Sequence, residues 1–310
     1  MRVLITGSSG QIGTNVALAL LDRGDEVCGI DIRPNPWTKR IPTVLRDLNR
    51  PTDDDFGQTG KFDVVLHLAA HAKVFELVET PRRAMENVGM AFGVLEYCRR
   101  HRTPLIFGSS REVYGDIHRH VTDESQADFV VAESPYSASK IAGEAFIYSY
   151  AQCYKLPHLV FRFSNVYGRY DCDLERLERV IPLFIRRIHQ EEPIVVYGRE
   201  KVLDFTYIDD CVNGVVRAID LLVAGKVSRE TINLAYGQGA TLQDLVNIIG
   251  LALQKQPKVH YEPSRSGEVT RYVADISKAR RLLGYTPQTP LTAGVPLSIE
   301  WQRSIGVLKA

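Results

Sequence analysis

Three glycines near the start of the chain constrain its fold more than any other feature. They follow the apolar run Val3 to Ile5 and precede a helical pattern of apolar residues. Such a run is typical of a buried parallel strand, and glycines at this spacing let a phosphate approach the helix N-terminus closely. The sequence therefore predicts a strand, a tight turn and a helix that together bind the pyrophosphate of a dinucleotide. The turn residues expected to contact it are Gly7, Ser9, Gly10, Gln11, Ile12 and Gly13.

A second predicted strand, residues 26–30, ends at Asp31. A carboxylate at this strand end normally binds the ribose 2′-hydroxyl of NAD, and its charge repels the 2′-phosphate of NADP. We expect Asp31 and the adjacent Ile32 to contact NAD. The positive charge of Arg33, two residues later, keeps NADP as an alternative cofactor.

Further strand-like and helix-like segments alternate along the first half of the chain. Predicted strands cover 43–45, 64–68, 105–107 and 159–163, and predicted helices cover 84–100 and 136–154. This alternation predicts an α/β fold with a doubly wound parallel (Rossmann) sheet. Prolines punctuate the second half, as expected for a smaller C-terminal substrate lobe. We assign residues 1–164 and about 199–240 to the dinucleotide-binding domain, and about 165–198 and 241–310 to the substrate lobe.

Ligands of such sheets bind at the carboxyl ends of the strands, where several informative residues fall. Asp47 and Leu48 follow the third strand, where they are expected to bind the adenine. The small side chains of Ala69 and Ala70 follow the fourth strand and leave room for a cofactor. Ser110 follows the fifth strand.

Tyr136 and Lys140 stand four residues apart, which puts both side chains on one face of a helix. A free tyrosine has a pKa of about 10, so it is a poor base at neutral pH. A neighbouring ammonium favours the phenolate, and lowering the pKa by about 3 units requires roughly 4 kcal/mol. The pair therefore predicts proton transfer by Tyr136.

Composition excludes several other classes of function. Lys and Arg number 38 against 37 Asp and Glu, a net charge of +1 that favours neither nucleic acid nor membrane binding. The five cysteines lack a C-x-x-C spacing, and the first strand starts too early for a signal peptide, so we expect a cytoplasmic protein with free thiols. His67 and His71 have no carboxylate at ligand spacing, so we expect no metal site.

From Val3 to about Trp301 the chain resembles the extended short-chain dehydrogenase/reductase family of NAD-dependent nucleotide-sugar epimerases and dehydratases. The resemblance rests on seven motifs. They are Thr-Gly-x-x-Gly-x-x-Gly at 6–13, His67-Leu68-Ala69-Ala70, Asn87-Val88, Ser109-Ser110-Arg111-Glu112-Val113-Tyr114-Gly115, the Tyr136/Lys140 pair, Arg162-Phe163-Ser164-Asn165-Val166-Tyr167-Gly168, and Asp204-Phe205-Thr206-Tyr207-Ile208-Asp209-Asp210.

The resemblance implies a role for each motif. Tyr136 would take the proton of the sugar 4-hydroxyl while hydride passes from C4 to NAD, Lys140 would hold the nicotinamide ribose, and Ser110 would hydrogen-bond O4. Leu68, Asn87 and Phe163 would join the NAD site. The substrate, a UDP-linked sugar, would contact Lys73, Ser110, Arg111, Glu112, Asn165, Arg265 and Arg271. The helix after Tyr136 would form the interface of a homodimer.

The arginine at position 111 helps to decide which reaction follows oxidation of the sugar at C4. Family members that dehydrate at C4 and C6 typically carry an aspartic acid at this position, and an arginine cannot act as that acid. A UDP-sugar 4-epimerase is therefore the leading hypothesis, with Glu112 counted among the catalytic residues. Glu112 and Arg271 keep UDP-glucuronate decarboxylation open, and Glu112 also matches a dehydratase of the 5,6 type.

Three further points stay open at this stage. A non-catalytic NAD-binding protein is disfavoured by the intact proton-transfer residues, and an NADPH-dependent reductase is disfavoured by Asp31. Leu203 replaces an arginine that often contacts the substrate diphosphate in the family, and Arg199 or Lys201 could substitute for it.

Overall fold

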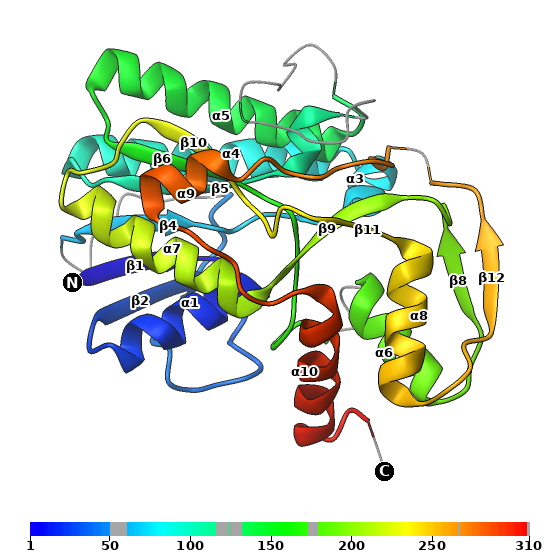
Figure 1. Cartoon of the computed structure of the whole chain (residues 1–310). Coiled ribbons are helices and arrows are strands. Elements are labelled where there is room, and N and C mark those ends of the chain that lie inside the picture. Colours follow the sequence, from blue (N-terminus) through cyan, green and yellow to red (C-terminus); the bar gives the residue numbers. More distant parts are fainter. Residues whose placement is uncertain (50–60, 116–123, 125–131, 173–178, 266, 309–310) are drawn as a thin grey trace.

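A computed structural model describes residues 1–49, 61–115, 124, 132–172, 179–265 and 267–308. Its centre is a sheet of seven parallel strands, which confirms the predicted doubly wound fold (Figure 1). The strand order is β3 (Thr43–Leu45), β2 (Glu26–Asp31), β1 (Arg2–Thr6), β4 (Val64–His67), β5 (Leu105–Ser110), β6 (His158–Phe163) and β10 (Glu230–Leu234). The order reverses between β1 and β4, and a crevice for ligands forms at such a switch point.

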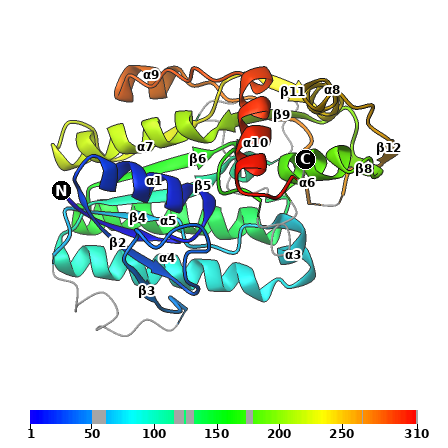
Figure 2. The same cartoon turned by 90° about the horizontal axis from the view of Figure 1, so that it is seen from below.

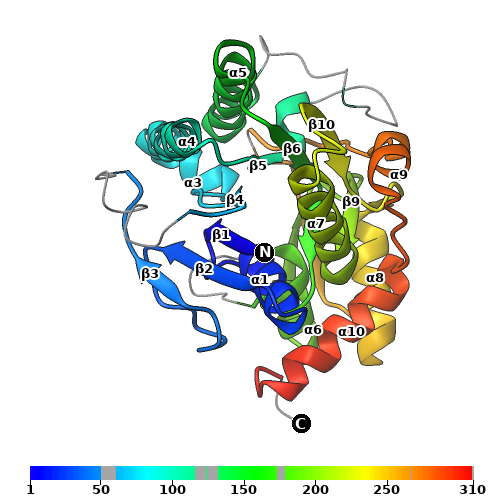
Figure 3. The same ribbon diagram turned by 90° about the vertical axis from the view of Figure 1, so that its left-hand side faces the viewer.

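Helices cover both faces of this sheet (Figure 3). One face carries α4 (Arg82–His101) and α5 (Pro135–Tyr154), and the other carries α1 (Gln11–Asp22) and α7 (Ile208–Val223). Because side chains alternate along a strand, Val3 and Ile5 enter one hydrophobic core while Leu4 enters the other. The apolar run that predicted β1 is therefore buried on both sides.

The second half of the chain supplies most of the elements outside the main sheet, and several of them lie together at one end of the molecule (Figure 2). Three strands, β7 (Asn165–Tyr167), β9 (Val202–Tyr207) and β11 (Gly239–Thr241), form one small sheet. Two more, β8 (Ile194–Tyr197) and β12 (Val259–Glu262), pair in parallel. The remaining helices are α3 (Val74–Glu79), η1 (Arg111–Tyr114), α6 (Val180–His189), α8 (Leu242–Leu253), α9 (Ser277–Leu283) and α10 (Leu291–Ser304). Across the described ranges, no helix combines the length and apolar character needed to cross a bilayer.

The sequence fixes the start of α5 immediately before Tyr136. Ser134 is the N-cap, and its hydroxyl accepts a hydrogen bond from the backbone N–H of Ser137. Ser137 returns a side-chain contact to the Ser134 backbone, and Pro135 occupies the first helical position. This capping box holds the first turn in place, so the Tyr136 side chain leaves the helix at a defined point.

A buried polar network attaches α5 to the sheet. The Arg162 guanidinium on β6 makes two hydrogen bonds to the Glu144 carboxylate on α5, at 2.6 and 3.0 Å. The Ser109 hydroxyl on β5 donates to the same carboxylate at 2.5 Å. The Arg162 and Glu144 side chains are only 3% and 5% exposed. The network therefore sets the position of the helix that carries Tyr136 and Lys140.

We predict that Arg162→Met destabilises the protein by about 3–5 kcal/mol, because it leaves the Glu144 carboxylate buried without its cation. Arg162→Met/Glu144→Leu removes both charges and should recover most of that loss. The control is Arg40→Met, which breaks an exposed pair with Asp22 and should cost less than about 1 kcal/mol. Urea unfolding measures all three variants. Equal effects of Arg162→Met and Arg40→Met would contradict this prediction.

Candidate active site

A cavity of about 1020 Å³ opens at the carboxyl ends of the central strands. It is also lined by residues of the second half of the chain, including Asn165, Tyr197 and Arg265. The expected dinucleotide residues found in its wall are Gly7, Ser9, Gly10, Gln11, Ile12, Gly13, Asp31, Ile32, Asp47, Leu48, Leu68, Ala69, Ala70, Tyr136, Lys140 and Phe163. The expected substrate residues found there are Lys73, Ser110, Arg111, Glu112, Asn165 and Arg265.

Two of the three glycines in the turn, Gly7 and Gly13, have no room for a side chain. Gly7 has a φ of +74°, and a Cβ on it would lie 2.8 Å from the Ala69 nitrogen. A Cβ on Gly13 would lie 2.2 Å from the Gly7 oxygen. The turn thus brings bare backbone to the N-terminus of α1, where free N–H groups and the helix dipole favour a phosphate.

Asp31 stands at the end of β2, next to this turn. Its carboxylate accepts hydrogen bonds from the backbone N–H groups of Ser9, at 2.9 Å, and Arg33, at 3.2 Å. Each carboxylate oxygen has a further lone pair, so the group can also accept from ribose hydroxyls. The glycine turn and this carboxylate together fit the pyrophosphate and adenosine ribose of NAD.

Tyr136 and Ser110 meet at the carboxyl end of β5. The Ser110 hydroxyl lies near enough to the Tyr136 phenol to lower its pKa, and it accepts a hydrogen bond from the Glu112 N–H at 3.2 Å. It therefore caps the short helix η1 and contacts the phenol at the same time. Lys140 lies one turn further along α5, where its ammonium donates to the Gly108 carbonyl at 2.7 Å and lies 5.8 Å from the centre of the Tyr136 ring.

Burial acts on both members of the pair. It raises the pKa of Tyr136 to about 12, against the opposing effect of the Ser110 hydroxyl. It also lowers the pKa of Lys140 to about 8. Desolvation disfavours the charged form of each group, and the proton transfer expected of Tyr136 stays a prediction.

Arg111 and Glu112 form an ion pair in the cavity wall. The Nη2 atom of Arg111 lies 2.9 Å from Oε1 of Glu112, and the two side chains are 12% and 6% exposed. Burial raises the pKa of the Glu112 carboxyl, and the Arg111 cation opposes that rise. The Arg111 Nη1 and Glu112 Oε2 atoms are buried and make no hydrogen bond to the described residues. The ion pair thus leaves one buried donor atom and one buried acceptor atom without a partner among the described residues.

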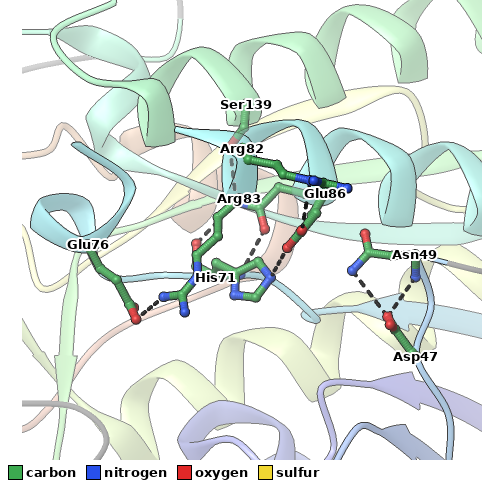
Figure 4. A network of polar contacts seen from close by, with 9 residues as sticks. Asp47, Asn49, His71, Glu76, Arg82, Arg83, Glu86 and Ser139 are labelled. Atoms are coloured by element: carbon green, nitrogen blue, oxygen red, sulfur yellow. Dashed lines mark hydrogen bonds and ion pairs between the residues drawn. The ribbon is translucent and has the colours of Figure 1, made fainter. Parts of the chain in front are cut away.

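Asn87 is not in the wall of the cavity, although the sequence placed it in the NAD site. Its side-chain oxygen accepts from the His71 N–H at 2.8 Å, and its amide nitrogen donates to the His71 carbonyl at 3.1 Å and to the Ser139 hydroxyl at 3.2 Å. It fixes the segment after β4 against α5. Figure 4 shows His71 in this network, where its Nε2 atom pairs with Glu86 at 2.9 Å, and Asp47 bonded to Asn49.

Some of the basic residues expected near the substrate line the cavity, and others lie outside its wall. The Arg265 guanidinium lies 3.8 Å from the centre of the Tyr197 ring in the cavity, and Lys201 lines the same cavity while pairing with Glu268. Arg199 pairs with Glu200 at 3.5 Å and is largely exposed, outside the wall. Arg271 also lies outside the wall, in a β-bridge with Val202. Of the two candidates to replace the missing arginine, Lys201 lines the cavity and Arg199 does not.

The histidines at and after the end of β4, His67 and His71, take part in hydrogen bonds. The His67 Nδ1 atom lies 2.6 Å from the Thr6 hydroxyl, and burial lowers the pKa of His67 to about 3. Within the ranges that the structure describes, no group of three His, Cys, Asp or Glu residues could hold a metal ion.

Asp171 and Arg179 are among the cavity residues that were not predicted from the sequence. Arg179 pairs with Asp171 at 3.2 Å and donates to the Gln11 side chain at 2.8 Å. No local pattern indicates this contact, because 168 positions separate Gln11 from Arg179.

Comparisons with known proteins agree with this geometry. Residues 3–235 match the model of the NAD dependent epimerase/dehydratase family. An uncharacterized UDP-glucose epimerase of Bacillus subtilis is 30% identical, covering 98% of this chain and 99% of its own. The UDP-glucose 4-epimerase of Thermotoga maritima, solved with UDP-glucose, has a TM-score of 0.89 at 27% identity over 98% of this chain and 99% of its own.

The UDP-glucuronic acid 4-epimerase of Bacillus cereus, solved with UDP-glucuronic acid and NAD, has a TM-score of 0.88 at 26% identity. That match covers 98% of this chain and 100% of the other. The glycine turn, the Tyr136–Ser110 contact and these matches identify the chain as a member of the NAD-dependent epimerase/dehydratase family.

Proposed function

We propose that the protein is an NAD-dependent 4-epimerase of a UDP-linked hexose or uronate, acting through a transient 4-keto sugar. The observation that carries this proposal is the contact between Tyr136 and Ser110 inside the cavity that also holds the glycine turn. The UDP-sugar epimerases that the chain is similar to support the substrate class.

Each catalytic residue has a distinct task in this mechanism. Tyr136 removes the proton of the sugar 4-hydroxyl, and the Ser110 hydroxyl hydrogen-bonds O4 and passes that proton to the phenolate. Lys140 supplies a positive charge on the same helix face and holds the nicotinamide ribose. The glycine turn, Asp31 and Lys140 would hold NAD, which would supply the acceptor and donor of the C4 hydride.

The Arg111–Glu112 pair favours epimerisation over the alternatives. A 4,6-dehydration needs an acid beside Ser110, and the guanidinium there cannot release a proton at neutral pH. Decarboxylation or dehydration would use Glu112, whose Oε1 atom is paired with Arg111 in the cavity wall. Arg271, the expected ligand of a uronate carboxylate, lies outside that wall. With both alternatives disfavoured, the 4-keto sugar would take the hydride back at C4, and this step gives the epimer.

The substrate diphosphate and sugar are assigned to the second lobe and the rim of the cavity. We assign Arg265 and Asn165 to the diphosphate, with Lys201 in place of the arginine that Leu203 replaces, and Lys73 to the sugar. The two lobes of this proposal are 1–164 with about 199–240, and about 165–198 with 241–310. The pairing of β10 with the main sheet, and of β8 with β12 outside it, supports this division, whereas β9 pairs with β7 and β11 across it.

We further propose a cytoplasmic homodimer. Cys28, Cys98, Cys153 and Cys211 are free thiols, which suits a reducing compartment. Helices α4 and α5 expose Phe92 and Phe146, which are 44% and 39% exposed and meet edge to face with ring centres 5.8 Å apart. Neighbouring exposed aromatic rings of this kind favour a protein interface.

The epimerase proposal predicts a product of unchanged mass. Incubation with UDP-glucose, UDP-N-acetylglucosamine and UDP-glucuronate should convert at least one of them into its C4 epimer, seen by mass spectrometry and NMR. Tyr136→Phe is the matched control, because it removes only the acidic hydroxyl, and it should lower turnover by about 10²- to 10⁴-fold while NAD still binds. A product lighter by the mass of CO₂ or of water would contradict the proposal.

The dimer proposal predicts that Phe92→Asp/Phe146→Asp forms monomers at concentrations where the unchanged protein is dimeric. Charge placed in a desolvated interface is costly, and analytical ultracentrifugation measures the change. Leu251→Asp, at a position 79% exposed on α8, is the control and should remain dimeric. If the double variant sediments like the unchanged protein, this face is not the interface.

A further inference from the structure

Three buried side chains form a row across the central sheet, on the face that α4 and α5 cover. Thr6 on β1 pairs in register with His67 on β4, and His67 pairs in register with Phe107 on β5. Residues paired in register point to the same face of a sheet, so these side chains are neighbours. The His67 Nδ1 atom lies 2.6 Å from the Thr6 hydroxyl, and the His67 ring stacks on the Phe107 ring with centres 5.7 Å apart.

The Phe107 ring faces the Lys140 ammonium. The Nζ atom of Lys140 lies 5.1 Å from the centre of the Phe107 ring, nearer than the 5.8 Å to the Tyr136 ring. A ring face within about 6 Å of a cation attracts it. The next residue along β5, Gly108, accepts a hydrogen bond from the same ammonium at 2.7 Å. Strand β5 therefore gives Lys140 two adjacent contacts, a ring face and a carbonyl.

Helix α5 has a glycine at the place where it crosses this ring. A Cβ on Gly143 would lie 2.6 Å from the Phe107 Cζ atom, so the ring leaves no room for a side chain there. Glycine weakens the interior of a helix relative to alanine, and Gly143 lies well inside α5. The close approach of helix and ring accounts for this glycine. It also brings Lys140, three residues earlier on the same helix face, to the ring.

The charged and titratable groups around the ammonium come from three elements. Tyr136 and Glu144 face Lys140 from α5, and the Glu144 carboxylate is already paired with Arg162 of β6. His67 faces it from β4, and burial, together with the nearby Lys140 charge, lowers the pKa of His67 to about 3. His67 is therefore neutral. Because burial also lowers the pKa of Lys140, a neighbour that favours its charged form matters near neutral pH.

We infer that Phe107 is a positioning residue whose ring face holds the Lys140 ammonium in place. His67 supports the ring from the neighbouring strand, and Gly143 lets α5 approach closely enough for the contact. The task of Lys140 beside Tyr136 rests on the proposed function, whereas the contact between ring and ammonium does not. Loss of the ring's attraction would favour the neutral amine, which offers no positive charge to a phenolate.

Replacement of Phe107 by pentafluorophenylalanine tests the contact, because fluorine removes the negative charge of the ring face while a ring of similar shape remains. The pKa of Lys140 is measured by ¹³C NMR of its Cε atom in the full-length protein without nucleotide, and the signal is assigned by its loss in Lys140→Met. The value, about 8 in the unchanged protein, should fall by about 0.5 to 1 pH unit. The same replacement of Phe161, buried in the other hydrophobic core, is the control and should leave it unchanged.

Turnover at two pH values distinguishes this role from a purely structural one. A lower pKa means that the ammonium is lost at a lower pH as the pH rises. The fluorinated ring at Phe107 should therefore reduce kcat about two- to fivefold at about pH 8 and leave it unchanged at about pH 6, where both proteins keep the charge. A structural defect would reduce kcat at both pH values.

Gly143→Ala moves the ring without changing its chemistry and should also lower the pKa of Lys140. Gly89→Ala is its control, because the nearest atom to a Cβ there is the Asn49 Oδ1 atom at 3.9 Å. An unchanged pKa in Gly143→Ala would contradict the part assigned to that glycine. The inference on Phe107 is overturned if its fluorinated ring leaves the pKa unchanged, if Phe161 has the same effect, or if kcat falls equally at both pH values. A failure to epimerise any sugar would count against the proposed function and leave the NMR result unaffected.

Discussion

The contact between Tyr136 and Ser110 joins a helix to the end of a strand, and the proposed chemistry depends on it. It forms because the Arg162–Glu144 pair and Ser109 hold α5 against β5 and β6. The capping box at Ser134 then starts the helix immediately before Tyr136. A small rotation of α5 would separate the phenol from the serine, so a buried ion pair remote from the ligands controls the geometry at the reacting atoms.

Charges in the cavity wall restrict what the site can do after oxidation at C4. Burial makes Tyr136 and Lys140 resist ionisation, with pKa values of about 12 and about 8. A cation near the phenol therefore acts against a large desolvation effect. Arg111 pairs with Glu112, and in the proposed function it stands where a 4,6-dehydratase would carry a general acid, so this one residue would disfavour both alternative reactions.

The sequence predicts those parts of the molecule that short-range spacing specifies. The glycine turn, the parallel strands and the Tyr136/Lys140 face of α5 follow from periods of two and 3.6 residues and from backbone sterics. The strand predicted at 105–107 continues to Ser110, because small residues carry little strand signal. Asn87 binds the backbone of His71, and Arg179 reaches Gln11. Such contacts depend on how distant segments pack, and a single sequence has no pattern for them.

The central claim is that Tyr136 and Ser110 direct chemistry to C4 while Arg111 keeps Glu112 from acting at C5. Turnover of the best UDP-sugar substrate in D₂O tests this most directly, with NMR of both epimers. We expect the hydrogens at C4 and C5 to come entirely from the substrate, because the hydride returns within one site and no base removes the C5 proton. Deuterium at C5 would contradict the claim by showing that a base such as Glu112 acts there, and deuterium at C4 would show that the hydride does not return.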